Sequence, residues 1–289
     1  MGRGIDHLVL PVRDIRKARG FYQQLGFTVT PVNWHPFGTM NSLVQFDSCF
    51  LELLAVADES AIPDADDDVF SFAGFNRDFL KHREGFSMLV LESASAEEDR
   101  KAFDAAGLRT YQPFRFVRDG RMPDGSTRTV AFSLTFASTP QITEAGFFTC
   151  QQHFPENFWN RDYQSHDNGV GAIAGVVMAA PEPETLKTFF EGFSGETAKP
   201  DPAGGIRIET ARGGIQLLSP EAVATVYGKA VLPPDLAEPR FVAAAFAAPD
   251  LPAMRERLTA TSIPHDQVGS TLVVPPTAAF GTALLFTAS

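Results

Sequence analysis

Short apolar runs, each followed by an amphipathic helical stretch, recur four times along the chain. The first run covers residues 5–12 and has the composition of a strand. Asp14 then caps a predicted helix over 15–25, with Ala18 and Tyr22 on its apolar face, and Gly26 ends that helix. Strands are predicted at 27–30, 42–46 and 50–55. The unit therefore reads as one strand, one helix and three further strands.

Three more units of this kind follow. Their first strands are predicted at 86–91, 173–178 and 241–246, and their helices at 96–106, 183–190 and 251–259. One unit leaves its sheet edges exposed, so we expect the units to pair. This gives two domains, 1–160 and 168–289, joined by a polar linker at 157–168.

The predicted fold class is α+β, with four βαβββ units paired into two cupped, barrel-like mixed sheets and the helices outside. A continuous α/β sheet is the alternative, and it is less favoured because strands follow each helix in threes.

Composition narrows the classes of function. The 289 residues carry a formal charge of −11, and no stretch is basic enough to follow a phosphate backbone, so we expect no nucleic-acid partner. No apolar run is long enough for a membrane span, and two cysteines form no disulfide framework, so a cytoplasmic location is expected. The 26 phenylalanines suit cores and apolar pocket walls.

Two stretches resemble a known superfamily. The run Ile5-Asp6-His7-Leu8-Val9-Leu10-Pro11-Val12 with Phe21-Tyr22 resembles the opening of the glyoxalase/bleomycin resistance/dioxygenase (vicinal oxygen chelate) superfamily. Residues 35–46 and 50–54, together with 148–156 and 166–169, are similar to one branch, the glyoxalase-like domain proteins. The resemblance covers about 1–56 and 147–170.

The resemblance implies a metal-centred site inside the first cupped sheet, with ligands from the first and last strands of a unit. In the first unit these positions hold His7 and Glu52. An imidazole nitrogen and a carboxylate oxygen suit zinc, manganese, nickel or iron(II). The second unit offers Met88 and then Cys150 or Gln151 at the matching positions, so Gln151 or the nearby His153 would complete the shell. The third and fourth units lack a ligand set and are interpreted as a structural or lid-forming half.

Glu52 is the strongest candidate, as a ligand or a catalytic group. A buried carboxylate costs several kcal/mol unless it is paired, and strand alternation places Glu52 on the face of Phe50 and Leu54. The alternative is that it turns to solvent. His7 is expected to share a face with Ile5 and Val9, and its alternative interpretation is a core histidine.

Further candidates lie outside the first strand of the unit. The loop around His35 contains proline and glycine, and loops of this kind often carry binding groups. The candidates for substrate binding are His35, Gly38, Thr39 and Asn41. The alternative is a plain surface loop. His153 is a candidate general base that could instead cap a strand end. Cys49 and Cys150 are interpreted as small buried residues.

Two functions stay open. The leading hypothesis is a metal-dependent lyase, isomerase or dioxygenase acting on a small oxygenated molecule. The alternative is a metal-free protein that binds or sequesters a small molecule, as bleomycin-resistance relatives do. A homodimer that pairs exposed sheet edges is a further expectation.

Overall fold

The first half of the chain contains two successive units. In the computed structural model, which describes residues 2–121 and 125–288, the strands of this half are β1 (Ile5–Pro11), β2 (Asn33–Trp34), β3 (Thr39–Gln45), β4 (Phe50–Val56), β5 (Met88–Glu92), β6 (Arg109–Thr110), β7 (Phe114–Arg121), β8 (Thr127–Ser138) and β9 (Gly146–Gln152). Its helices are α1 (Ile15–Gln24), the 3-10 turn η1 (Glu59–Ala61), α2 (Phe72–His82), α3 (Ala96–Ala105), α4 (Pro155–Phe158) and α5 (Arg161–Gln164).

The second half repeats this order. Its strands are β10 (Ala172–Ala179), β11 (Lys199–Pro200), β12 (Gly205–Glu209), β13 (Gly214–Leu218), β14 (Arg240–Ala248), β15 (Asp266–Val268), β16 (Thr271–Val274) and β17 (Ala283–Ala288). Its helices are η2 (Pro183–Leu186), α6 (Lys187–Ser194), α7 (Pro220–Tyr227), η3 (Lys229–Val231) and α8 (Leu251–Ala260). None of the helices in the described ranges is long and apolar enough to cross a membrane.

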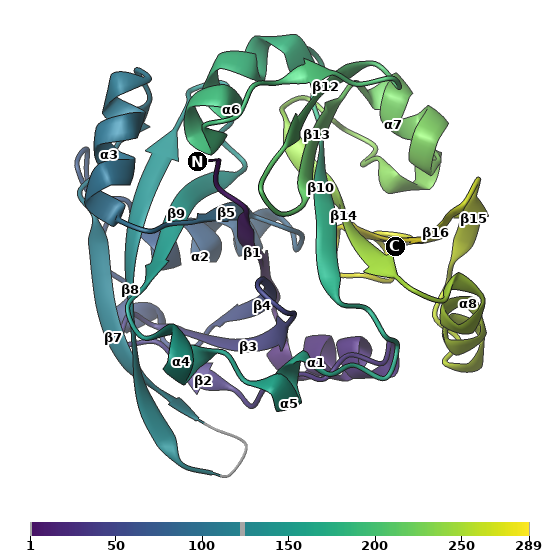
Figure 1. The fold of residues 1–289 in the computed structure, drawn as a ribbon, viewed down its shortest axis with the longest axis horizontal. Coiled ribbons are helices and arrows are strands. Elements are labelled where there is room, and N and C mark those ends of the chain that lie inside the picture. Colours follow the sequence, from purple (N-terminus) through teal and green to yellow (C-terminus); the bar gives the residue numbers. More distant parts are fainter. Residues whose placement is uncertain (1, 122–124, 289) are drawn as a thin grey trace.

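The strands form two mixed sheets that lie side by side (Figure 1). One has the order β2-β3-β4-β1-β5-β9-β8-β6 with β7 paired to β8, and the other has the order β11-β12-β13-β10-β14-β17-β16-β15. In each sheet the first strands of two units pair antiparallel at the centre, and each pairs in parallel with the last strand of its own unit. The predicted fold class is confirmed: four βαβββ units form two mixed sheets, and neither sheet closes into a barrel.

Two local predictions were wrong. No strand forms at 27–30: Phe27 and Val29 are buried in the core, but the segment makes only one backbone bond to β3, from Thr30 to Leu43, and one bond is too few for a ladder. The short β2 takes that place in the sheet. Helices α2 and α7, between paired units, were not predicted.

The convex faces of both sheets contribute to one large buried cluster, together with side chains from the helices of all four units. Phe147 on β9 shows this sharing, since its ring lies 4.9 Å from that of Phe189 and 5.6 Å from that of Phe193, both in the second half. The concave faces carry two separate clusters. We call the hollow over the concave face of the first sheet the first cup, and its counterpart in the second sheet the second cup.

Candidate active site

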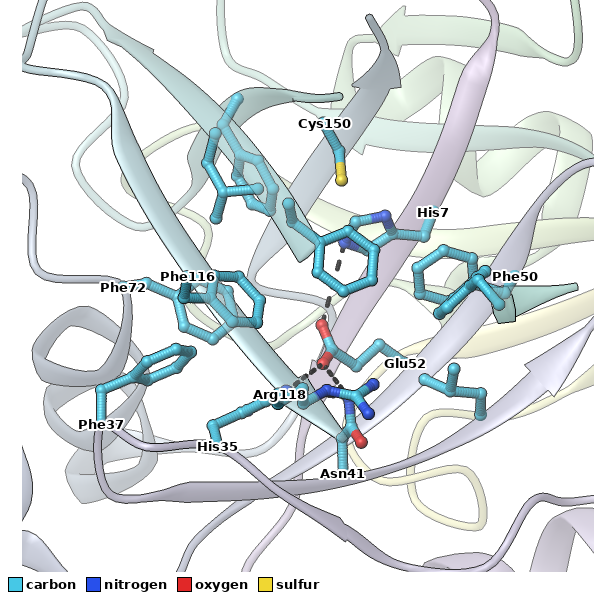
Figure 2. Close-up of a pocket in the computed structure, with 15 residues that line it drawn as sticks. His7, His35, Phe37, Asn41, Phe50, Glu52, Phe72, Phe116, Arg118 and Cys150 are labelled. Carbon is cyan, nitrogen blue, oxygen red and sulfur yellow. Dashed lines mark hydrogen bonds and ion pairs between the residues drawn. The ribbon is translucent and has the colours of Figure 1, made fainter. Parts of the chain in front are cut away.

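The first cup holds a pocket with roughly 430 Å³ of empty space, its open mouth included. Strands β1, β3, β4 and β7 to β9 form its walls, while Phe72 from α2 and Phe158 from α4 extend the lining. The lining combines many aromatic rings with one polar group of side chains (Figure 2). The aromatic part consists of Phe37, Phe50, Phe72, Phe116, Phe132, Phe148 and Phe158, and the polar part of His7, His35, Asn41, Glu52, Arg118 and Cys150.

His7 faces this pocket on the same side of β1 as Val9, and an irregularity in the strand lies just before it. The pairing with β5 shifts register between Ile5 and His7, so Asp6 has no partner of its own in that ladder. Ile5 therefore faces the shared core and not, as expected, the side of His7. Asp6 remains buried, and its Oδ1 lies 2.5 Å from His7 Nδ1. An ionised carboxylate only accepts, so Nδ1 carries the proton and Nε2 is left to face the pocket.

Glu52 lies on β4 and is 5% exposed. Strand alternation points it into the pocket with Phe50, as the sequence predicted, and not to solvent. Asn41 Nδ2 on the neighbouring β3 donates a hydrogen bond of 2.6 Å to Glu52 Oε1. Burial raises the pKa of the Glu52 carboxyl above its usual range, and His7, Asn41 and Arg118 offset this only in part. Glu52 is thus poised to exchange a proton closer to neutral pH than an exposed glutamate.

His35 reaches the same carboxylate from the turn between β2 and β3. Its Nε2 lies 3.9 Å from Glu52 Oε1 and 3.2 Å from Asn41 Nδ2, and its Nδ1 lies 2.8 Å from Thr39 Oγ1. Burial, and to a lesser degree the charge of Arg118, holds the pKa of His35 well below its usual value. His35 is therefore neutral, with Nε2 accepting from Asn41 and Nδ1 donating to Thr39.

Gly38 and Thr39 are not among the residues that line the pocket. Gly38 has a φ of +85°, and a Cβ there would lie 2.4 Å from the carbonyl oxygen of Asp58. A glycine is therefore required to form the turn that carries His35. Of the four predicted substrate-binding residues, His35 and Asn41 face the pocket, while Gly38 and Thr39 shape the turn and orient His35.

A gap of 3.8 Å separates His7 Nε2 from Glu52 Oε2. This distance is too long for a direct hydrogen bond, and the two atoms face each other across the pocket (Figure 2). A polar chain continues on both sides, through Asp6 to Gln152 Nε2 (3.1 Å) and through Asn41 to His35. The gap is the place where a ligand atom can contact an acid and a base at once.

Gln151 and His153 do not join this group. Gln151 pairs with Ser133 on the opposite face of the sheet, where its side chain bonds the backbone at Ala94 and Ala96, at the start of α3. His153 Nε2 lies 2.8 Å from Ser133 Oγ. Because side chains alternate along a strand, Cys150 faces the pocket and Gln151 faces away. The predicted role of Gln151 as third ligand, and that of His153 as general base at the pocket, need correction.

The donor set does not complete a resident metal site. His7 Nε2 and Glu52 Oε2 are oriented like two ligands, with Asp6 behind the imidazole. On β5 and β9 the second unit presents Met88, Val90, Phe148 and Cys150 to the concave side. Burial raises the pKa of the Cys150 thiol well above its usual value, which disfavours a thiolate ligand. Within residues 2–121 and 125–288 no three His, Cys, Asp or Glu side chains form a metal-binding group. Catalytic zinc sites have three protein ligands.

Arg118 is the pocket residue that the sequence analysis missed. It lies on β7, where Phe114, Phe116 and Arg118 alternate toward the first cup while Arg115 and Val117 are exposed. The period-two pattern of the two phenylalanines was the signal that could have identified it. Asp6, the partner of His7, was missed because no alternation predicts that two neighbouring residues lie together in a bulge.

Comparison with known proteins agrees with this architecture. The profile of the glyoxalase-like domain family matches residues 5–192, well over half of the chain. The chain belongs to this family. No curated protein matches the sequence of this glyoxalase-like chain.

Solved structures place the glyoxalase-like chain in the vicinal oxygen chelate fold. A hypothetical protein from Staphylococcus aureus has a TM-score of 0.71 at 11% identity, covering 99% of this chain and 100% of that one. The Mn(II)-bound glyoxalase from Novosphingobium aromaticivorans has a TM-score of 0.57 at 12% identity, covering 100% and 83%. Homoprotocatechuate 2,3-dioxygenase from Arthrobacter globiformis has a TM-score of 0.56 at 12% identity, covering 100% and 80%. At these identities the likeness concerns the fold.

Proposed function

We propose that this protein is an isomerase or lyase of the glyoxalase type that moves a proton within a small, oxygenated and largely apolar molecule. The observation that carries the proposal is the gap of 3.8 Å between His7 Nε2 and Glu52 Oε2 inside a pocket lined with aromatic rings. An acid and a base on two sides of one ligand position are what a proton transfer between neighbouring atoms requires.

The steps follow from the protonation states. Glu52, as a carboxylate, takes a proton from the carbon next to a carbonyl group, while a protonated His7 gives its Nε2 proton to the carbonyl oxygen. With a 2-hydroxyketone the product is an enediol. Glu52 then gives its proton to the former carbonyl carbon while His7 Nε2 takes the proton of the other hydroxyl group, which isomerises the ligand and restores both side chains. Asp6 stabilises the imidazolium through Nδ1, and Asn41 holds one oxygen of Glu52 in place. The surrounding phenylalanines exclude water and strengthen these interactions.

Two structural neighbours, a Mn(II)-bound glyoxalase and a dioxygenase, support chemistry on oxygenated molecules and the metal-dependent form of the hypothesis. That form needs at least one more protein ligand than His7 and Glu52. Elemental analysis by mass spectrometry on untagged protein, soaked with zinc, manganese, nickel or iron(II), tests it. About one bound ion per chain, lost in Glu52→Ala, would replace direct proton transfer with metal-assisted chemistry.

The direct test is hydrogen exchange in the ligand. In D₂O, NMR follows loss of the CH₂ signal of 2-hydroxyacetophenone, an uncharged aromatic hydroxyketone, with wild-type protein and with Glu52→Gln. We expect catalysed exchange that falls about 10²-fold or more in the variant, the usual contribution of a general base. Glu97→Gln, on the exposed face of α3, is the matched control and retains wild-type exchange. Exchange that is equal in wild type and Glu52→Gln would refute the role of Glu52.

The lining of the pocket favours a second function, a binding protein without chemistry. Seven phenylalanines give a large apolar contact area for a flat molecule. Tight binding of aromatic ligands with no exchange, unchanged by Glu52→Gln, would support this function instead.

A further inference from the structure

Arg118 brings a positive charge into the pocket that no carboxylate contacts directly. In the described parts of the chain, no carboxylate oxygen lies within the 4.0 Å limit of an ion pair with its guanidinium. One of its nitrogens donates a hydrogen bond of 3.1 Å to the backbone oxygen of Asp119, while its Nε is buried and without a partner. Buried guanidinium groups are normally paired, so the unused donor needs an explanation.

The electrostatics point the same way. Burial lowers the pKa of Arg118, and the attraction of Glu52 opposes this without removing it. Arg118 and Glu52 attract each other without forming an ion pair, and the carboxylate of Asp6 lies behind His7. Arg118 is thus the guanidinium at the polar end of the pocket, in a protein of net charge −11.

The position of Arg118 selects the shape of an anionic partner. Its guanidinium carbon lies 6.0 Å from the ring centre of Phe132, and the Phe116 and Phe132 rings stack 5.2 Å apart. Figure 2 shows the guanidinium beside Glu52 and Asn41, at the polar end of the pocket. A flat apolar body among the rings would bring an oxyanion to Arg118 and place adjacent atoms near the gap between His7 and Glu52.

We infer that Arg118 binds the carboxylate of the ligand, and that the ligands of this pocket are flat, mainly apolar carboxylic acids. The inference deepens the proposed function, since it concerns the same pocket, but binding tests it without turnover. Arginine suits this role because its planar fork bonds both oxygens of a carboxylate. The competing explanation is that Arg118 serves only to neutralise Glu52.

Calorimetry with two matched probes separates these explanations. 3-Phenylpropionate and 3-phenylpropionamide have nearly the same shape and differ in charge. We expect wild type to bind the acid at least about tenfold more tightly, the effect of one charge-assisted hydrogen bond. Arg118→Gln should bind the two probes alike, whereas Arg115→Gln, exposed on the same strand, keeps the preference. Thermal unfolding of each variant verifies that it is folded.

Three outcomes would overturn the inference: equal affinity of wild type for acid and amide, a preference for the acid that survives in Arg118→Gln, or no binding of the acid at millimolar concentrations. Exchange of uncharged 2-hydroxyacetophenone distinguishes this failure from that of the proposed function. Exchange without acid preference refutes the inference alone. Acid preference without exchange of either 2-hydroxyacetophenone or phenylpyruvate, an aromatic keto acid with a CH₂ group beside the carbonyl, refutes the proposed function alone.

Discussion

The two cups are built on the same strand plan but differ in what fills them. Over the second cup, α7 and the segment after it pack Ala222, Val223 and Val231 against the sheet. Its central polar residue, Gln216, donates to Asp201 at 2.9 Å and accepts from Tyr227 at 2.6 Å. In the first cup the corresponding connection supplies Phe72 to the pocket wall.

The two cups also differ in their central polar residue. Gln216 in the second cup has a partner for both ends of its amide, and beside it Arg207 Nε makes no hydrogen bond, while in the first cup Asn41 Oδ1 and Arg118 Nε are buried without one. Unpaired buried polar atoms cost stability, so a protein retains them where a ligand uses them. We propose that binding and chemistry take place in the first cup and that the second has a structural role.

The largest expected effect separates the two cups directly. Glu52→Gln should lower ligand proton exchange about 10²- to 10⁴-fold, because it removes the base without changing the shape of the pocket. Gln216→Glu, at the centre of the second cup, should leave exchange unchanged. NMR in D₂O measures both, and a comparable loss in the second variant would break the comparison.

The shared core predicts that the halves do not unfold separately. Phe147→Ala should lower the free energy of unfolding by about 3–5 kcal/mol, because a ring that packs on both halves leaves a cavity. Calorimetry should show one transition that moves as a whole. Two transitions, with only the first displaced, would instead support the division into 1–160 and 168–289, which stays a prediction.

Asp6 should act as a positioning residue. Asp6→Asn keeps the size of the side chain but removes the charge that stabilises a protonated His7, so exchange should fall about 10- to 100-fold. Its pH profile should also change on the limb that reports His7, and a merely structural role would not produce this. An unchanged profile with lower stability would argue against it.

The smallest effect concerns stability and pH. Burial raises the pKa of Glu52 in the folded state above its ordinary value of 4.5. The carboxyl therefore contributes its full stabilisation at pH values below 4.5, and this stabilisation is lost as the pH rises through the folded-state pKa. Glu52→Gln should therefore be more stable than wild type above that pH, by an amount on the order of 1 kcal/mol, and equal below it. Thermal unfolding from pH 4 to 8 measures this, with Glu97→Gln as control.

The sequence by itself determined the repeat and half of the site. Apolar runs identified the first and last strands of every unit, because these strands are buried and consist almost entirely of apolar residues. Alternation along the strand placed Glu52 toward the pocket. The proline and glycine near His35 identified the loop that leads into the strand of Asn41. These properties are local, so a single stretch of chain contains them.

Only the tertiary structure decided the rest of the site. The bulge at Asp6 turns Ile5 to the shared core and puts Asp6 beside His7, and the face of β9 puts Cys150 inside and Gln151 outside. Arg118 lines the same pocket as Glu52 but comes from β7, in the distant β7–β8 hairpin, and no local pattern encodes this approach. Register and cross-strand approach depend on the pairing of distant segments, and a shift of one residue exchanges the two faces of a strand.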